Sequence, residues 1–285
     1  MNALRIACVK YLNARPLIRG WPGDVDFDHP SALSKRLADG ELDVALVSSF
    51  EFLRNPIYRI VNGVSISSDG PVYSVVVAHH GDISQIKEIE LDPASQTAVN
   101  LLRCLLAELG LNPRFVRGAL GRIGCQPVVP GNLPDKKARL LIGDQAIRLR
   151  HDHAGEFHFW DLGEQWKKLV GSPFVYALWL VRPEVADAKT IANRLRALRN
   201  ENLANLDQLI AEVVAGVGLS RRNSSAEADD PVQRNPLDPE FCSRYYREHL
   251  RFSFGEKEKR GLRTFADLCA KHGLLEKRDL GFSFV

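Results

Sequence analysis

The chain has 285 residues, of which 45% are hydrophobic and 26% are charged. These fractions are close to the globular average, so they exclude a disordered, collagen-like or low-complexity chain, and the length suits two domains or one large α/β unit. The formal net charge is only +3 and no stripe of basic residues is present. We therefore predict no nucleic-acid partner, whereas a small anionic ligand is compatible with this charge.

Cysteines and hydrophobic runs exclude further classes of protein. The five cysteines form no CxxC pattern, which argues against a zinc ribbon and a disulfide framework. No run approaches 18 consecutive apolar residues, so no membrane span is predicted. The apolar run Leu4–Val9 lacks the length and the cleavage site of a signal peptide, and a strand explains it. We expect a cytoplasmic protein without a membrane partner.

The first part of the chain alternates short strands with helices. Strands are predicted at 5–9, 24–27 and 43–47, and helices at 11–19, 31–38 and 50–54. We expect Ser31 to cap the second of these helices and Gly40 to follow its end. Strands that alternate with helices at this spacing are typical of βαβ units and a mainly parallel sheet.

The middle of the chain predicts a second group of strands around one strong helix. Strand candidates lie at 64–68, 72–78, 87–91, 115–117 and 140–142. The strand at 72–78 is long enough to leave the first domain. Ser95–Leu109 has apolar residues at i, i+3, i+4 and i+7, the pattern of an amphipathic helix. The Gly- and Pro-rich residues 118–137 are expected to be irregular.

The last part begins with an apolar strand at 174–181 that can return the chain to the first domain. Helices are predicted at 189–201, 206–214, 239–251 and 256–273, with a long, polar, mobile connection at 218–239. The predicted fold class is therefore α/β with two lobes. Residues 1–78 plus 174–285 form one discontinuous lobe with the C-terminal helices, and residues 79–173 form an inserted lobe. Two connections make a hinge, and a ligand would lie in the central cleft between the lobes.

Small polar residues follow several of the predicted strands, where ligands of α/β proteins bind. The segments are Tyr11-Leu12-Asn13, Ser48-Ser49, Ser67-Ser68-Asp69-Gly70, Ser95-Gln96-Thr97 and Gly143-Asp144-Gln145. Helix N-termini with hydroxyl groups bind anions such as carboxylates, and the Ser95–Thr97 turn is the best candidate. Each segment is equally explained as an ordinary helix cap.

Histidines offer a weaker hypothesis. His151, His153 and His158 could hold a metal, but no further ligand pattern accompanies them, and a solvated loop is the favoured interpretation. His79-His80 lies at the predicted hinge without a partner that the sequence can name. No metal site is predicted.

Six longer motifs, in a fixed order, resemble one known family. They are YLNARPL (11–17), LDVALVSS (42–49), DGPVYSV (69–75), LIGDQA (141–146), DLGEQW (161–166) and GSPFVYALW (171–179). Their order is similar to that in chorismate dehydratases of the futalosine route to menaquinone. The resemblance is strong over residues 4–182 and loose over the C-terminal helices.

This resemblance implies a type II periplasmic-binding-protein fold used as a cytoplasmic enzyme. The implied reaction dehydrates chorismate to 3-[(1-carboxyvinyl)oxy]benzoate, with no metal or organic cofactor. Asn13 matches the family's active-site Asn, and Ser74 matches the active-site Ser of its GPVxS motif. The chain departs from the family at Ser95-Gln96-Thr97-Ala98, where Ser-Arg-Thr-Ser is usual, and at Val170-Gly171-Ser172-Pro173, where Thr-Gly-Leu-Pro is usual.

These assignments give a hypothesis for the mechanism. Ser95 and Thr97 would bind one carboxylate of chorismate, while Asn13 and Ser74 would bind the leaving hydroxyl or the second carboxylate. The base would be Asp144 or the enolpyruvyl carboxylate of the substrate itself. The predicted substrate-binding residues are Ser48, Ser49, Ser68, Asp69, Gly70, Ser95, Gln96, Thr97 and Gly143. The alternatives are a solute-binding protein for a small carboxylate and the related dihydroxynaphthoate-forming enzyme; the sequence predicts no oligomeric state.

Overall fold

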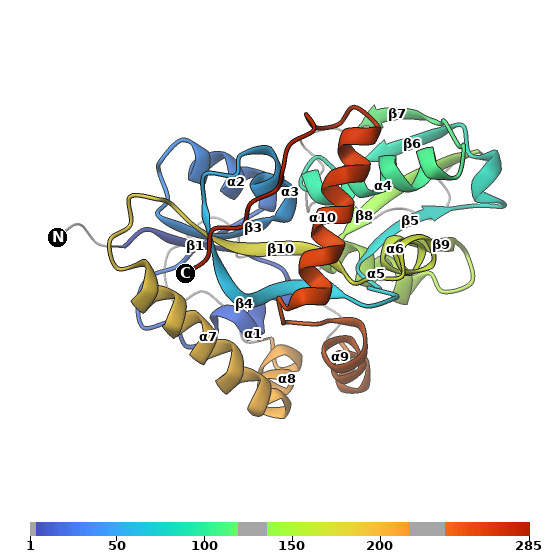
Figure 1. Ribbon diagram of the computed structural model, residues 1–285. Helices are drawn as coiled ribbons and strands as arrows, with labels where there is room; N and C mark the ends of the chain where they lie inside the picture. The colour runs from blue at the N-terminus through green and yellow to red at the C-terminus, as the bar shows by residue number, and fades with distance from the viewer. Residues whose placement is uncertain (1–3, 119–135, 217–236) are drawn as a thin grey trace.

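The computed structural model describes residues 4–118, 136–216 and 237–285, which form two lobes, each built on a five-stranded sheet (Figure 1). The first sheet has the order β2-β1-β3-β10-β4, and its strands are β1 (Ile6–Val9), β2 (Asp26–Asp28), β3 (Val44–Ser48), β4 (Arg59–Ser68) and β10 (Phe174–Val181). The second has the order β7-β6-β8-β5-β9, and its strands are β5 (Val75–His79), β6 (Glu88–Leu91), β7 (Arg114–Arg117), β8 (Lys137–Ile142) and β9 (His158–Asp161).

Helices pack on the faces of both sheets. They are α1 (Arg15–Ile18), α2 (Pro30–Ala38), α3 (Ser49–Arg54), α4 (Gln96–Glu108), α5 (Gly143–Asp152), α6 (Leu162–Val170), α7 (Ala188–Ala204), α8 (Leu206–Val214), α9 (Pro239–Arg244) and α10 (Glu256–Lys271). A 3₁₀ turn (Leu12–Ala14) precedes α1, a second (Ile83–Gln85) precedes β6, and a π-helical turn (Tyr245–His249) follows α9. Within the described residues, no helix is long and apolar enough to cross a membrane.

Both sheets mix parallel and antiparallel pairs. In the first, β1 is parallel to β2 and β3, as the βαβ pattern predicts, whereas β10 is antiparallel to β3 and β4. In the second, β6 is parallel to β7 and β8, and β5 is antiparallel to β8 and β9. β10 is buried along its whole length, which explains its continuous apolar sequence because a central strand contacts the core on both faces.

The chain passes between the sheets twice. The first crossing, residues 69–74, joins β4 to β5, and the second crossing, residues 171–173, joins α6 to β10. Strand β5 pairs with β8 and β9 of the second sheet, so the first crossing lies ahead of Val75 rather than after Ala78, where the sequence analysis set the boundary. His79 is consequently at the far end of β5, beside His158 of β9, and not at the crossing.

Other local expectations need correction. Helix α2 begins at Pro30 after His29, so Ser31 lies inside its first turn and is not its cap.

The histidines at 151 and 153 lie at the C-terminal end of α5, in place of the predicted loop. In the described parts of the chain, no three His, Cys, Asp or Glu side chains lie close enough together to hold a metal ion. Strand β9 and helix α6 had no predicted counterpart. Most of the segments 118–137 and 218–239 lies outside the described residues.

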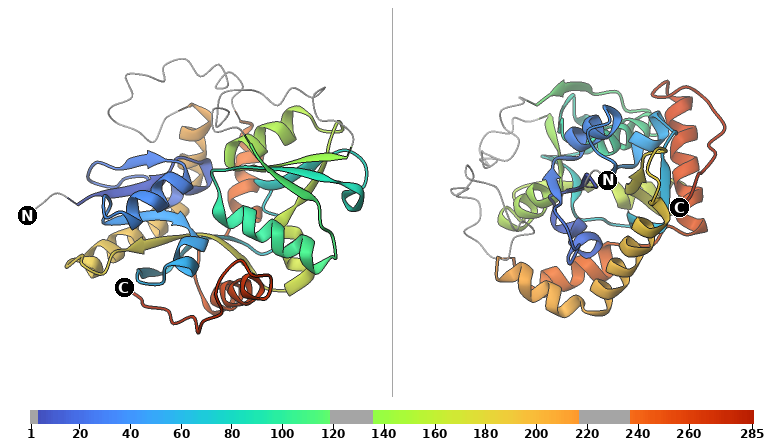
Figure 2. Two further views of the ribbon diagram at one scale, coloured as in Figure 1. Left: turned by 90° about the horizontal axis from the view of Figure 1, so that it is seen from above. Right: turned by 90° about the vertical axis from the view of Figure 1, so that its left-hand side faces the viewer.

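The C-terminal helix α10 extends over both lobes (Figures 1 and 2). It packs against β10 of the first sheet and against α4 of the second lobe. Gly261 lets α10 approach the second crossing, because a Cβ at this position would lie 2.0 Å from the carbonyl oxygen of Pro173. At the far end, Glu108 of α4 accepts hydrogen bonds from Lys271 and His272, both at 2.6 Å. Helix α10 therefore contacts both lobes, although it is distant in sequence from β10 and from α4.

Candidate active site

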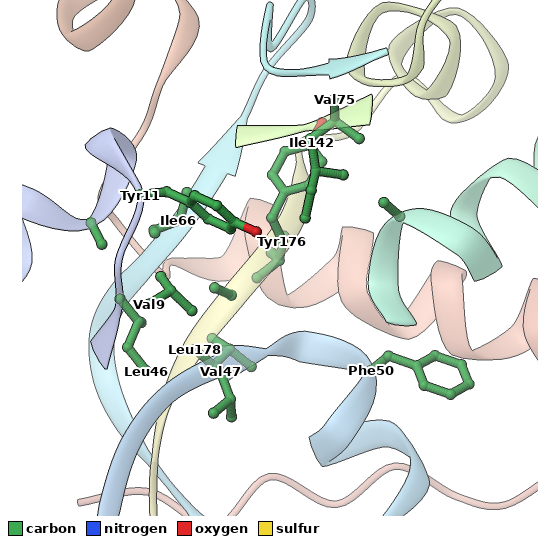
Figure 3. Close-up of a cluster of buried hydrophobic side chains, with 14 of the residues drawn as sticks. Val9, Tyr11, Leu46, Val47, Phe50, Ile66, Val75, Ile142, Tyr176 and Leu178 are labelled. Carbon is green, nitrogen blue, oxygen red and sulfur yellow. The ribbon is translucent and has the colours of Figure 1, made fainter. Parts of the chain in front are cut away.

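A cavity of about 50 Å³ lies between the two sheets, beyond the carboxyl ends of β1 and β3. Its polar lining consists of hydroxyl and amide groups, and no formally charged side chain is among the described residues that form its wall: Val9, Tyr11, Asn13, Pro30, Ser48, Ile66, Val75, Ser95, Thr97, Ala98, Ile142, Gly143, Tyr176 and Ala177. Figure 3 shows Tyr11 and Tyr176 between strands of the first sheet and Val75 and Ile142 of the second. The cavity thus combines an apolar body with a few hydrogen-bonding groups, as small-molecule sites do.

The N-terminus of α4 forms one end of this cavity and contacts the first lobe. Ser95 caps the helix, since its Oγ accepts from the backbone N–H of Ala98 at 3.1 Å. Ser48 Oγ bonds the Thr97 hydroxyl and also accepts from the Thr97 N–H at 3.1 Å. Ser49 Oγ is 3.3 Å from the same hydroxyl and donates to the carbonyl of Val175. Four of the predicted binding residues therefore meet at one interlobe contact.

Gln96 carries a buried acceptor at the same helix end. Its Oε1 is buried and has no hydrogen-bond partner among the described residues. A buried amide oxygen without a partner is costly, so this group can gain from a donor such as a substrate hydroxyl. Of the predicted anion-binding turn, Ser95 and Thr97 line the cavity, whereas Gln96 does not.

Asn13 and Ser74 are joined by a residue that the sequence analysis did not single out. Tyr245 donates from Oη to Ser74 Oγ at 2.8 Å, and the Asn13 side chain lowers the pKa of the same hydroxyl. Asn13 lines the cavity, whereas Ser74 is fully buried and lies directly before the wall residue Val75. Burial raises the pKa of the Tyr245 hydroxyl far above its usual range, so Tyr245 remains a neutral donor.

Asp144 lies in the first turn of α5 and contacts the opposite lobe. Its Oδ1 accepts from the backbone N–H of Leu12 at 2.9 Å, directly beside Asn13. Burial raises the pKa of this carboxyl, and the charges of Arg148, Arg15 and Lys10 act in the opposite direction. Asp144, like Ser74 and Gln96, is not among the residues that line the cavity in this structure.

Where the two lobes meet at the cavity, position 143 requires glycine for two independent reasons. Its φ of +59° is a conformation that other residues rarely adopt, and a Cβ would lie 2.7 Å from the ring of Tyr11. Its N–H donates to the carbonyl of Ser74 at 2.8 Å. Gly143 therefore allows the second lobe to approach the first at the cavity.

The segment after β4 is divided between the cavity and the surface. Ser68 Oγ donates to the carbonyl of Gly70 at 2.9 Å and lies 3.2 Å from the hydroxyl of the wall residue Tyr176. Asp69 is exposed and pairs with Lys167 at 2.5 Å, so the structure places it outside the cavity. Gly70 is buried at the start of the first crossing and is not part of the wall.

Two tyrosines in the wall are neutral hydrogen-bonding groups. Burial raises the pKa of Tyr176 well above 10, and burial together with the carboxylates of Asp92 and Asp144 does the same for Tyr11. The Tyr11 hydroxyl lies 3.1 Å from Nδ1 of His29. Tyr176 lies within the GSPFVYALW motif, one of the six on which the family resemblance depends. This motif is the sequence feature that could have identified Tyr176 as a candidate site residue.

Asp161 holds the first crossing in place from beneath the site. Its carboxylate accepts from the backbone N–H groups of Val72 and Tyr73 at 3.0 and 2.8 Å. It also caps α6 through Gly163 and Glu164, at 3.0 and 3.2 Å. Tyr73 has a φ of +68°, unusual for a residue with a side chain, and these bonds help to hold it there. The sequence presented Asp161 only as part of a motif and gave no sign of these distant partners.

Solved structures define the class of fold. The alkanesulfonate-binding protein SsuA from Xanthomonas axonopodis pv. citri, bound to MOPS, superposes with a TM-score of 0.65 at 17% identity, over 97% of this chain and 95% of that chain. A protein from Archaeoglobus fulgidus gives a TM-score of 0.69 at 18% identity, over 95% of this chain and 98% of that one. The chain therefore has a periplasmic-binding-protein-like fold, as the sequence analysis predicted.

Sequence comparison defines the family. The family model described as menaquinone biosynthesis matches residues 4–271, and the chain belongs to this family. The chorismate dehydratase of Thermus thermophilus is 29% identical over 255 residues, which cover 84% of this chain and 83% of that protein.

Proposed function

We propose that this protein is a chorismate dehydratase of the futalosine route to menaquinone, acting in the cytoplasm without a metal or organic cofactor. The observation that carries the proposal is the match of nearly the whole chain to the menaquinone biosynthesis family, together with its similarity to the Thermus thermophilus enzyme. The cavity supports it, because its hydroxyl and amide groups can bind a small carboxylic acid. The fold alone would not distinguish an enzyme from a binding protein.

The reaction removes water from a ring that then becomes aromatic. The C3–H bond breaks and its proton goes to a base. The electron pair forms the C3=C4 bond, and the C4–O bond breaks with release of hydroxide, which takes up a proton to give water. Negative charge spreads toward the ring carboxylate before the hydroxide leaves. Hydrogen-bond donors placed at that carboxylate and at the C4 oxygen would therefore lower the barrier.

We assign the carboxylate-binding role to the N-terminus of α4. Ser95, Gln96 and Thr97 lie there, and the partial positive charge of the helix end favours an anion. In the present structure Ser48 of the first lobe accepts from the Thr97 N–H. We propose that the second lobe moves about the crossings 69–74 and 171–173. Opening would free the Thr97 N–H from Ser48, and a carboxylate of the substrate would then accept its hydrogen bond.

We assign binding of the C4 hydroxyl to Asn13 and Ser74. Asn13 lies in the cavity wall and belongs to the first lobe, opposite the lobe that carries the α4 N-terminus. Ser74 lies directly before β5 and accepts a hydrogen bond from Tyr245. Together they provide an amide and a hydroxyl for a leaving group that is itself both donor and acceptor.

We propose that the base is the enolpyruvyl carboxylate of the substrate and not Asp144. Two observations support this choice: the described wall residues include no carboxylate or imidazole, and Asp144 Oδ1 already accepts from Leu12 N–H. A carboxylate attached to C3 through the ether oxygen can reach the neighbouring proton without help from the protein. It could then pass the same proton to the departing hydroxide.

Replacing Asp144 by asparagine tests this choice. The amide keeps an oxygen that can accept from Leu12 N–H, so we expect kcat to remain within about threefold of wild type. Loss of a general base would instead lower kcat by about 100-fold or more. Steady-state kinetics with chorismate measures the difference, and Asp152→Asn, at the exposed end of the same helix, is the matched control.

The proposed function itself is tested by incubating purified protein with chorismate and no added cofactor. We expect a product that is lighter by the mass of one water and absorbs as a benzoate, detected by mass spectrometry and ultraviolet spectroscopy. Unchanged chorismate that nevertheless binds would identify a solute-binding protein. Release of pyruvate with hydroxybenzoate would identify a different lyase.

A further inference from the structure

Tyr245 lies at the start of an unusual turn. The chain leaves α9 and forms one π-helical turn, Tyr245–His249, before it continues to α10. Such turns are rare and occur frequently at functional sites, because the wider turn rotates side chains away from their normal helical positions. Tyr245 and Tyr246 are both buried, and both hydroxyl groups bond to segments that carry candidate catalytic residues.

The hydrogen-bond directions around Tyr245 orient the two candidate catalytic groups. Tyr245 Oη donates its single proton to Ser74 Oγ. Ser74 therefore keeps its own hydroxyl proton for another acceptor. The Asn13 side chain acts on the same hydroxyl and lowers its pKa, against the larger effect of burial. Asn13 Oδ1 is buried and has no partner among the described residues, so it remains available as an acceptor.

The rest of the turn restricts where the Tyr245 hydroxyl can go. Phe241 stacks on the Tyr245 ring with centroids 5.7 Å apart and an interplanar angle of 14°. Tyr246 Oη donates to the carbonyl of Leu12 at 2.8 Å, the residue directly before Asn13. The turn thus bonds the backbone directly before Asn13 and the side chain of Ser74.

We propose that Tyr245 is a positioning residue for the dehydration: its hydroxyl holds Asn13 as a hydrogen-bond acceptor and Ser74 as a donor toward the C4 hydroxyl of the substrate. This inference rests on the proposed function. Asn13 Oδ1 accepts the hydroxyl proton of the bound substrate, and Ser74 donates to the same oxygen as the C4–O bond breaks. Without the Tyr245 hydroxyl, the amide can rotate and the serine proton can turn toward other acceptors.

The test is Tyr245→Phe, which keeps the ring and its contact with Phe241 and removes only the hydroxyl. We expect kcat for chorismate to fall by about 10- to 100-fold, as small misplacements of catalytic groups do, with KM within about twofold. The matched control is Tyr58→Phe, because Tyr58 is equally buried in the first lobe and bonds Asn55 and Glu51 instead of the site. It should leave kcat and KM unchanged.

A double-substitution cycle shows whether Tyr245 acts through its neighbour. Tyr245→Phe should lower kcat by a smaller factor in a Ser74→Ala background than in wild type, because the Ser74 hydroxyl that Tyr245 positions is then absent.

Two outcomes would overturn the inference while the proposed function stands. They are an equal fold decrease in kcat in both backgrounds and a wild-type kcat in Tyr245→Phe. A fall in kcat that parallels a fall in melting temperature would assign Tyr245 to stability and also overturn it. Wild-type protein that leaves chorismate unchanged would overturn the proposed function and this inference with it.

Discussion

Asn13→Ala should lower kcat for chorismate by about 100- to 1,000-fold, the loss typical of removing one preorganised polar group from an active site. The substitution removes both the amide that contacts Tyr245 and the unpartnered oxygen at the cavity. Steady-state kinetics with detection of the benzoate product measures the effect. Stability should change little, because this oxygen makes no hydrogen bond within the described part of the folded chain.

The control for this prediction is Asn62→Ala, at an exposed position in β4 where the backbone is hydrogen-bonded. It should retain wild-type kcat and melting temperature. Wild-type turnover by Asn13→Ala would remove Asn13 from the mechanism and leave the assignment of the C4 hydroxyl site without support.

Asp161→Ala should lower the free energy of unfolding by about 3–5 kcal/mol, the range for breaking one partner of a buried charged network. The substitution leaves the backbone N–H groups of Val72 and Tyr73 without their acceptor at the first crossing, and it removes the cap of α6. Arg150 also loses its carboxylate partner, 3.3 Å away. Urea unfolding monitored by circular dichroism measures the change.

Asp39→Ala is the matched control, because this carboxylate is exposed at the end of α2 and pairs with Lys35 on its own helix. A surface pair within one helix contributes about 0.3–0.5 kcal/mol. If Asp161→Ala and Asp39→Ala had similar effects, the bonds of Asp161 to the crossing would not stabilise the fold. A variant that is stable but slow would point instead to a role of the crossing in lobe movement.

Several parts of the site could be predicted because their causes are local. The apolar repeat in Ser95–Leu109 requires a helix, and Ser95 before it is a strong cap, so the sequence placed Ser95 correctly at the N-terminus of α4. Ser48 is the last residue of a strand that is otherwise apolar, so its place at a strand end was equally clear. Asn13 was selected from its place after a predicted strand and then by motif resemblance, whereas Ser74 was selected by the resemblance alone.

Other parts depend on contacts that no local pattern records. Asp144 was selected as a possible base from its place after a strand, but its partner, the backbone of Leu12, is 132 residues away in the chain. The first crossing was placed too late because residues 72–78 are rich in β-branched residues and were predicted as one strand, and only pairing with β8 and β9 determines that β5 begins at Val75. Strand β9 is short and only partly buried, so its sequence has no clear alternation to detect.

The sequence by itself determined the α/β class, the order of most elements, the helix that follows Ser95 and the family. Those features follow from hydrophobic periodicity, capping residues and contiguous motifs, all of which act over a few neighbouring residues. The tertiary structure decided that Tyr245 bonds Ser74 across 171 residues, that Asp161 holds the first crossing, and that α10 joins the lobes. The physical reason is that a hydrogen bond depends on distance and direction in space, and these are set only when both sheets and the C-terminal helices have packed together.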